Sequence, residues 1–286
     1  MRVVIALGGN ALLPKGAAGT AAEQRKAAKS ALRRLSGLLR SHEVALTHGN
    51  GPQVGSLLLQ QHATRKVPEM PLDVLDAMTQ GEIGYFMQGA LPRKSAAVLT
   101  RVVVSEKDPA FRHPTKPVGP FYAKKPKGKY VMDSGRGYRL VVPSPKALGI
   151  LEKDAIITLM RAGFAVVCGG GGGIPVAKGG RGLEAVIDKD DFSSLLASTV
   201  KADLLVFITS VDCAYRDFSG AKIPIRRARA AEMERLLRSG EFAEGSMKPK
   251  VEAAVRFARH GGKAVICSIG NIREALAGKA GTAISR

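Results

Sequence analysis

The regular alternation of short apolar runs with longer amphipathic stretches constrains the fold of this 286-residue chain more than any other feature. The apolar runs predict strands at Arg2–Leu7, Val44–Thr47, Ala97–Ser105, Phe164–Cys168, Glu184–Ile187, Leu204–Thr209 and Ala264–Ser268. Helical spacing predicts helices at Ala21–Arg40, Pro71–Leu91, Ile150–Ala162, Asp190–Lys201, Ala228–Leu237 and Lys248–His260. Such alternation predicts an α/β fold, a three-layer αβα sandwich with a mainly parallel open sheet. Ligands of such sheets bind beyond the carboxyl ends of the strands.

Residues 106–149 interrupt this alternation. They contain seven of the chain's 15 prolines and five aromatic residues, and ten Lys or Arg residues against three acidic ones. We expect a small protruding flap subdomain built from short strands and turns. Its aromatic and basic residues are compatible with base stacking, but no recognisable nucleic-acid-binding motif accompanies them. We therefore expect no specific nucleic-acid partner.

Charge and composition narrow the possible functions further. The formal net charge of +20 would attract anions such as nucleotides and acyl phosphates over long range. No apolar run approaches the ~20 residues of a membrane span, so we expect no membrane partner. Cys168, Cys213 and Cys267 lie far apart and indicate reduced core thiols in a cytoplasmic protein. The chain lacks the P-loop motif, and no G-x-G-x-x-G follows its first strand, which argues against a P-loop kinase and a dinucleotide oxidoreductase.

The first glycine-rich turn is ALGGNAL, Ala6–Leu12, directly after the first predicted strand. Gly8 and Gly9 would let a phosphate approach the backbone without a Cβ in the way, and the Asn10 amide could donate to a phosphoryl oxygen. A tight strand–helix turn explains the same residues equally well.

The second is THGNGPQVG, Thr47–Gly55, in which Pro52 is suited to the first turn of a helix. Gly49, Asn50 and Gly51 precede that helix N-terminus, where free N–H groups favour a carboxylate or an acyl phosphate. A left-handed glycine turn is the alternative. His48 is either a base or a structural hydrogen-bond partner.

The third is CGGGGGIPV, Cys168–Val176, with five consecutive glycines. A simple turn needs one or two glycines, and each further glycine carries a conformational-entropy cost. We therefore interpret the run, including Gly170 and Gly171, as backbone against which a ligand is pressed.

Three polar motifs follow later in the chain. In VIDKDDFSSLLA, Val186–Ala197, Asp188 or Asp190 could cap a helix, or Lys189 could supply charge to a phosphate while Asp190 orients it. In TSVDCAY, Thr209, Asp212 and Tyr215 either line a nucleotide pocket or form an ordinary polar loop. In GEFAEGSMKPK, Ser246 is a candidate N-cap, and Lys248 and Lys250 are either solvated surface lysines or, because cations are disfavoured at a helix N-terminus, hold a phosphate bound between them.

These six motifs, in this order, resemble those of the carbamate kinases within the amino-acid kinase family. The resemblance covers about residues 3–284 and includes three further segments: Pro71–Leu91, His113–Tyr122 with Gly135–Lys146, and Gly240–Ala254. It implies the amino-acid kinase fold, with an N-terminal lobe (1–185, flap included) for carbamate or carbamoyl phosphate and a C-terminal lobe (186–286) for ATP or ADP. It also implies a homodimer, reversible phosphoryl transfer, and Mg²⁺ held mainly by the nucleotide phosphates rather than by a protein metal site. Another small acyl acceptor on the same fold is the alternative.

The resemblance also implies a role for each matching residue. The acyl phosphate would be held by Gly8, Gly9, Asn10, Gly49, Asn50, Gly51, Gly170 and Gly171. Lys116 of the flap would reach over the site, and Lys189, Asp190 and Lys250 would stabilise the transferred phosphoryl group. Thr209, Asp212, Tyr215, Met247 and Lys250 would lie near the nucleotide. The excess of basic residues and Glu82, where glutamine is expected, depart from the family pattern.

Overall fold

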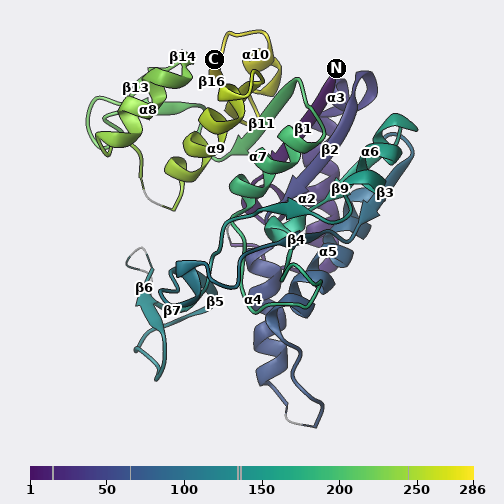
Figure 1. The fold of residues 1–286 in the computed structure, drawn as a ribbon, viewed down its shortest axis with the longest axis vertical. Coiled ribbons are helices and arrows are strands. Elements are labelled where there is room, and N and C mark those ends of the chain that lie inside the picture. Colours follow the sequence, from purple (N-terminus) through teal and green to yellow (C-terminus); the bar gives the residue numbers. More distant parts are fainter. Residues whose placement is uncertain (15, 65, 134, 136, 244) are drawn as a thin grey trace.

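In the computed structural model, eight strands form one open sheet in the order β14-β16-β15-β11-β1-β2-β9-β3 (Figure 1). The structure describes residues 1–14, 16–64, 66–133, 135, 137–243 and 245–286, and of Asn10 only the backbone. The strands of this sheet are β1 (Arg2–Leu7), β2 (Glu43–His48), β3 (Ser95–Val98), β9 (Ala165–Cys168), β11 (Leu204–Thr209), β14 (Arg227–Arg229), β15 (Lys263–Ser268) and β16 (Thr282–Ser285). Every neighbouring pair is parallel except β15 and β16. The predicted mainly parallel sheet is confirmed.

Helices cover both faces of this sheet. The α-helices of the described chain are α1 (Gly9–Leu12), α2 (Ala21–Arg34), α3 (Ser36–Ser41), α4 (Gly51–His62), α5 (Leu72–Gln88), α6 (Lys153–Arg161), α7 (Lys189–Thr199), α8 (Ala230–Arg238), α9 (Met247–Arg259) and α10 (Ile272–Leu276), of which α4 packs against α5 and the flap instead of the sheet. In β1, Val4 and Ala6 share a core with α6, α7 and α9, whereas Val3, Ile5 and Leu7 share a core with α2, α3, α5 and α10. Because successive side chains of a strand point to opposite faces, this alternation confirms the three-layer sandwich.

The flap stands away from the sandwich beside α4 (Figure 1). It consists of three antiparallel strands in the order β5-β7-β6, namely β5 (Lys116–Tyr122), β6 (Tyr130–Met132) and β7 (Tyr138–Val142). A small protruding subdomain is thus confirmed, but its sheet is shorter than the predicted 106–149. Beyond it, β8 (Gly149–Ile150) pairs with β4 (Arg101–Val103), which also pairs with β10 (Ile174–Val176). A hairpin of β12 (Ala214–Arg216) and β13 (Ile223–Ile225) follows β11.

The prediction of one strand at Ala97–Ser105 was wrong. The segment holds the end of β3 in the main sheet and then β4 in another sheet, with a break at Thr100. The Gln80 side chain, on α5, accepts from Thr100 N at 2.8 Å, and the Thr100 hydroxyl donates to Val98 O at 2.7 Å. These bonds replace ladder bonds at this residue, so the chain leaves the main sheet here.

Four other predicted elements also differ. Glu184–Ile187 is extended but is not a strand; its Val186 N donates to Pro143 O in a loop. The helix predicted over Ala21–Arg40 is two helices separated at Leu35. The helices predicted from Ile150 and Ala228 begin later, at Lys153 and Ala230, because the residues before them pair in β8 and β14.

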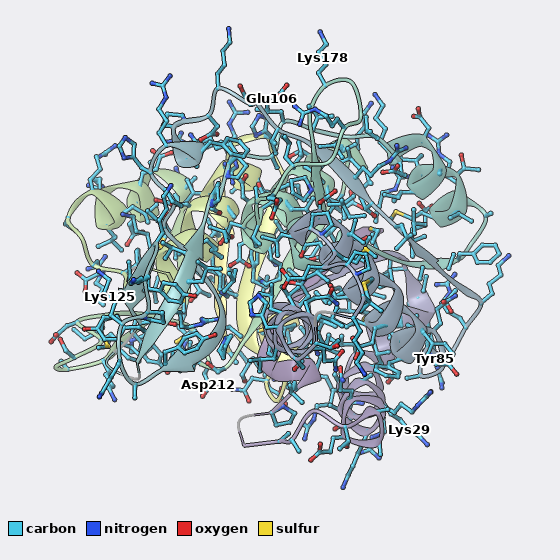
Figure 2. All side chains as sticks on the ribbon, turned by 90° about the horizontal axis from the view of Figure 1, so that it is seen from below. Lys29, Tyr85, Glu106, Lys125, Lys178 and Asp212 are labelled. Carbon is cyan, nitrogen blue, oxygen red and sulfur yellow. The ribbon has the colours of Figure 1, made fainter. Side chains whose placement is uncertain are left out.

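The basic side chains are spread over the surface. Lys29, Lys125 and Lys178 reach outward from separate parts of the molecule (Figure 2). The three cysteines are buried and unpaired. Within the described ranges, no helix has the length and apolar character needed to cross a membrane.

Candidate functional site

The glycine turns after β1 and β2 meet at the carboxyl edge of the sheet. Gly49 N donates to Leu7 O at 3.1 Å, and Gly8 N donates to Ile208 O, at the end of β11, also at 3.1 Å. A Cβ added to Gly49 would lie only 3.2 Å from the backbone nitrogen of Gly9. The close approach of the two turns therefore favours glycine at position 49, since any larger residue would need the turns to move apart by a few tenths of an ångström. The side chain of Asn10 lies outside the described residues.

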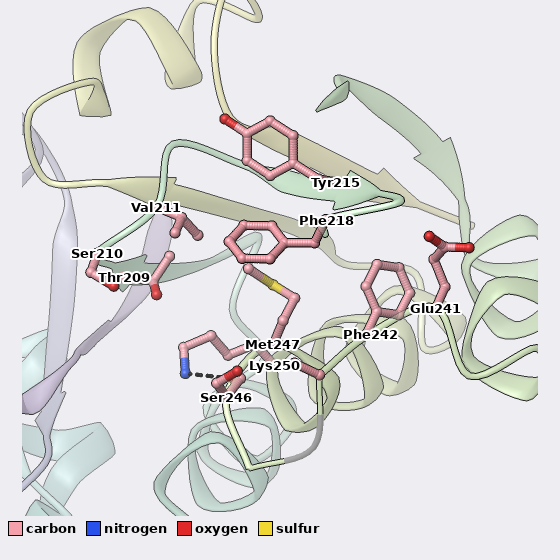
Figure 3. A pocket seen from close by; sticks show the side chains of 11 residues that line it. Thr209, Ser210, Val211, Tyr215, Phe218, Glu241, Phe242, Ser246, Met247 and Lys250 are labelled. Atoms are coloured by element: carbon pink, nitrogen blue, oxygen red, sulfur yellow. Dashed lines mark hydrogen bonds between the residues drawn. The ribbon is translucent and has the colours of Figure 1, made fainter. Parts of the chain in front are cut away.

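A charged cluster stands over these turns. Asp190 is buried, and its two carboxylate oxygens accept from two different lysines, Lys189 Nζ at 2.5 Å and Lys250 Nζ at 3.0 Å. Lys250 also donates to the backbone oxygen of Ser246 at 3.2 Å (Figure 3). Burial lowers the pKa of Lys250, and the charge of Asp190 opposes that shift. Asp190 thus holds two ammonium groups together, as the sequence predicted for an orienting residue.

Asp188 makes a second ion pair beside the first. It is the N-cap of α7 and accepts from Asp190 N at 2.9 Å, while its other oxygen accepts from Lys116 Nζ of the flap at 2.6 Å. Burial alone would raise the pKa of Asp188, but the charges of Lys116 and Lys189 and the backbone N–H of Asp190 outweigh it and lower the pKa to about 2. Three lysines against two carboxylates leave one positive charge in excess, which suits an anionic ligand.

A cavity of about 210 Å³ lies between the flap, the N-terminus of α4 and this charged cluster. Its lining brings together predicted residues from both halves of the chain: Gly49, Asn50, Gly51, Lys116, Gly171, Lys189, Asp190 and Lys250. The first residues of α4 present free backbone N–H groups to it, and Pro52 is in the first turn as predicted. The cavity therefore combines lysines with helix N–H groups, a set of donors suited to phosphate or carboxylate.

A second cavity, of about 130 Å³, is lined mainly by apolar and aromatic side chains (Figure 3). Thr209, Tyr215, Met247 and Lys250 line it, as the predicted nucleotide site requires. Asp212 does not; it lines a neighbouring surface hollow with Tyr215. Because Lys250 lines both cavities, a ligand group in one lies close to a ligand group in the other.

Several lining residues of the second cavity were missed from the sequence. They are Ser210, Val211, Phe218, Glu241, Phe242, Ala243 and Ser246. The Phe218 ring lies 6.0 Å from the Tyr215 ring, centroid to centroid, and Met247 lies on the other side of Phe218 (Figure 3). A lone phenylalanine beyond a polar motif gives no sequence signal, whereas Val211 lies inside the TSVDCAY motif and could have been included.

The five-glycine run has a different cause from the one predicted. A Cβ at Gly169 would come within 1.9 Å of the Phe192 ring, one at Gly170 within 2.2 Å of the His48 ring, and one at Gly173 within 2.2 Å of Val102 Cγ2. Gly169, Gly171, Gly172 and Gly173 also have positive φ. Packing and backbone conformation therefore require the glycines, and of the run only Gly171 lines the central cavity.

His48 and Gly170 lie away from the central cavity. His48 is 1% exposed, and burial lowers its pKa to about 4, so the ring is neutral at pH 7. With Gly170 it lines a different cavity, beside β3 and β9. Of the two roles left open for His48, this position supports the structural one. Ser246 occupies the N-cap position of α9 as predicted, but its side chain makes no capping hydrogen bond.

The described residues contain no group of three His, Cys, Asp or Glu side chains that could hold a metal ion. Asp188 and Asp190 are both engaged by lysines. This set of donors fits a Mg²⁺ ion that arrives on nucleotide phosphates, because Mg²⁺ is commonly bound through substrate phosphates and few carboxylates.

The fold and the site define a class of protein. The family model of the Amino acid kinase family matches residues 1–268. The chain therefore belongs to the amino acid kinase family.

Its relatives narrow the class. The carbamate kinase of Latilactobacillus sakei is 43% identical, with 100% of this chain and 99% of that protein covered. The carbamate kinase of Thermococcus kodakarensis is 42% identical over the same shares. The solved structure of carbamate kinase from Giardia lamblia bound to AMP-PNP is similar with a TM-score of 0.92 and 40% identity, covering 99% of this chain and 98% of that one. The similarity thus extends over the full length of carbamate kinases.

Proposed function

We propose that this protein is a phosphotransferase that transfers a phosphoryl group reversibly between MgATP and carbamate. The observation that carries the proposal is the position of Lys250, which lines both the cavity with lysines and helix N–H groups and the apolar cavity. The first suits carbamate or carbamoyl phosphate, and the second suits the adenine and ribose of a nucleotide. Full-length similarity to carbamate kinases, one of them bound to AMP-PNP, supports this assignment.

In the direction of ATP formation, a terminal oxygen of ADP attacks the phosphorus of carbamoyl phosphate. The bond between phosphorus and the carbamate oxygen breaks, and carbamate leaves with the electron pair, so no proton is transferred. Lys189 and Lys250 neutralise the oxygens of the phosphoryl group, and Asp190 keeps both ammonium groups at the junction of the cavities. Backbone N–H groups at Gly9, Asn50 and Gly51 align the acyl phosphate beside Gly49, whose own N–H is bonded to Leu7 O, with Asn10 as a further donor.

Lys116 is assigned to the same step. Its ammonium is paired with Asp188 at the edge of the central cavity and is carried by the first residue of β5. A phosphate bound there competes with Asp188 for the ammonium group of Lys116. Attraction between this phosphate and Lys116 would favour closure of the flap over the substrate.

The two parts of the chain take different substrates in this proposal. Residues 1–185, flap included, bind carbamate or carbamoyl phosphate, and residues 186–286 bind ATP or ADP. Among the residues assigned to the nucleotide, Thr209, Tyr215, Met247 and Lys250 line the apolar cavity, and Asp212 follows at its edge. Mg²⁺ carried by the nucleotide would supply further positive charge beside Lys250.

We further propose a homodimer. Strand β3 is one of the two outer strands of the main sheet, and Met78 and Tyr85 of the adjacent helix α5 are 44% and 59% exposed. Exposed apolar side chains beside an outer strand are typical of an interface between subunits. Light scattering after size-exclusion chromatography measures the mass directly. The cytoplasmic location indicated by the three cysteines stays a prediction, and so does the role in arginine metabolism that the resemblance implies.

The test of the proposed reaction is ATP formation from MgADP and carbamoyl phosphate by the purified protein. We expect rapid formation, and a loss on the order of 10²–10³ in kcat for Lys189→Ala and Lys250→Ala because each removes a charge from the phosphoryl group. Lys29→Ala, on the exposed face of α2, is the matched control and keeps full activity. Near-normal turnover in both site variants would contradict the assigned roles.

If the folded protein binds ADP but forms no ATP, the acceptor is wrong. A screen of other small acyl phosphates then tests the alternative, a kinase of the same fold with a different acceptor.

A further inference from the structure

The side chain of Asn50 is held from behind by helix α5. Its Nδ2 atom donates to Asp76 Oδ1 at 3.0 Å and to Thr79 Oγ1 at 2.9 Å. All three residues are buried, at 4%, 1% and 0% exposed. Both amide hydrogens of Asn50 are therefore used inside the protein.

Thr79 determines which way round this amide lies. Its hydroxyl donates to the backbone oxygen of Asp76 at 2.9 Å, so Oγ1 has no hydrogen left and can only accept. If the Asn50 amide were rotated by 180°, its oxygen would face Oγ1 with no hydrogen between them. The hydrogen-bond chain from Asp76 through Thr79 thus fixes the nitrogen toward α5 and the oxygen away from it.

The oxygen of Asn50 is left as an acceptor at the central cavity. No described residue donates a hydrogen bond to Oδ1. A fully buried oxygen without a donor would be unsatisfied, and among the described residues only Asp76 Oδ2 is in that state, so Asn50 Oδ1 is accessible to a ligand. Asn50 lines the cavity, and its amide lies against Gly171, where a Cβ would come within 2.6 Å of Oδ1. The other side-chain acceptors of the described lining, Asp188 and Asp190, are engaged by lysines, so Asn50 Oδ1 is the uncharged acceptor that remains for a ligand.

We propose that Asn50 Oδ1 accepts a hydrogen bond from the amino group of the substrate, and that Thr79 and Asp76 are positioning residues that turn this oxygen toward it. The inference rests on the proposed function, because carbamate and carbamoyl phosphate carry an –NH₂ group next to the carboxyl carbon. Acetyl phosphate has the same shape but a methyl group in that place. A buried acceptor left without its donor disfavours such an analogue.

The state of Asp76 agrees with this role. Burial raises its pKa to about 8, opposed by the hydrogen bond from Asn50 and assisted by the charge of Asp73, and its Oδ2 atom has no partner among the described residues. A neutral carboxyl group still accepts through Oδ1. Asp76 can therefore orient Asn50 without placing a negative charge behind a site for anions.

The experiment compares carbamoyl phosphate with acetyl phosphate as phosphoryl donors to MgADP. The readout is the ratio of their kcat/KM values in wild type, in Thr79→Val, which keeps the shape but removes the hydroxyl, and in Thr79→Ser, which keeps the hydroxyl. We expect Thr79→Val to lower the ratio by about tenfold, roughly the worth of one hydrogen bond, mainly through carbamoyl phosphate. Thr79→Ser retains the wild-type ratio.

A ratio unchanged in Thr79→Val, or an equal loss with both donors, overturns the inference while the proposed function stands. If wild type does not use carbamoyl phosphate at all, the proposed function fails and the inference fails with it. Thr79→Ala removes the same hydroxyl without added bulk, and it replaces the valine variant if that protein does not fold.

Discussion

At the scale of single residues, the ionisation of Asp76 depends strongly on its surroundings. Its pKa lies near 8 in the folded chain, against 3.8 for an ordinary aspartate. The folded state therefore binds a proton that the unfolded state has lost between about pH 4 and pH 8. Stability from this group is fully present below pH 3.8 and is lost as the pH rises through 8.

Asp76→Asn removes this titration but keeps the shape of the side chain. We expect its free energy of unfolding to exceed that of wild type by a growing margin as the pH rises from 6 to 8.5, reaching a few kcal/mol at about 1.4 kcal/mol per pKa unit. Urea unfolding of both proteins across that range measures the difference. Asp154→Asn, at an exposed position of α6, is the control. A margin that does not change with pH would show that Asp76 is ionised in the folded protein.

The residues of the site differ in whether a local sequence motif indicates them or only the tertiary structure reveals them. Lys189, Asp190 and Lys250 stand in compact motifs, so the sequence indicated them, and the ion pairs with Asp190 join two of these motifs. Thr79 and Asp76 act on a residue almost 30 positions earlier, a contact that only the tertiary structure creates. Glu82, the unexplained departure, accepts from Gln24 Nε2 at 2.9 Å, so it too depends on a distant partner.

At the scale of elements, helix α5 carries two glycines in contrasting positions. A Cβ at Gly84 would lie 2.8 Å from Ala97 Cβ of β3, whereas one at Gly81 meets nothing within 4 Å. Gly84→Ala therefore forces α5 away from β3, and we expect it to destabilise the protein by about 1–3 kcal/mol. Gly81→Ala, in the same helix, is the matched control and should stabilise by about 0.5–1 kcal/mol.

Thermal unfolding of the two variants beside wild type checks this contrast. Opposite shifts in Tm are the expected outcome. A shift of the same sign and size in both would mean that helix propensity, and not the contact with β3, controls the result.

Elements were predictable where a local pattern determined them. The strands β1, β2, β9 and β11 and most helices follow from apolar spacing, and their boundaries move by only a few residues. The break at Thr100 was not predictable, because it depends on Gln80 of another element. The glycine run was visible but misinterpreted, since its neighbours Phe192, His48 and Val102 come from three other parts of the chain.

At the scale of the whole molecule, one sheet serves both cavities. Strands β1 and β11, from opposite halves of the chain, are paired at its centre, and the turns after β1 and β2 lie beside the strand that leads to Thr209. This is the point where the chain order of the strands reverses, and such points open a crevice at the carboxyl edge. The sheet therefore sets the distance between the two ligands, while the flap and α9 bring lysines to them from outside.

The dispersed positive charge should act on encounter with substrate rather than on the chemical step. At a net charge of +20 the molecule attracts ADP and carbamoyl phosphate over a distance set by screening, about 30 Å at 0.01 M and 8 Å at 0.15 M ionic strength. We expect kcat/KM to fall by about tenfold between these salt concentrations while kcat changes little. Lys189 and Lys250 are partly buried in ion pairs with Asp190 and are screened less, so we expect kcat to depend little on salt.

A double variant separates distant charge from the charge of the site. Lys29→Glu with Lys178→Glu lowers the net charge by four at two exposed positions on different parts of the surface (Figure 2). Steady-state kinetics should give a shallower salt dependence of kcat/KM for this variant and an unaltered kcat. If wild type and variant show the same slope, only the lysines around the cavity attract the substrates, and the remaining positive charge has no part in catalysis.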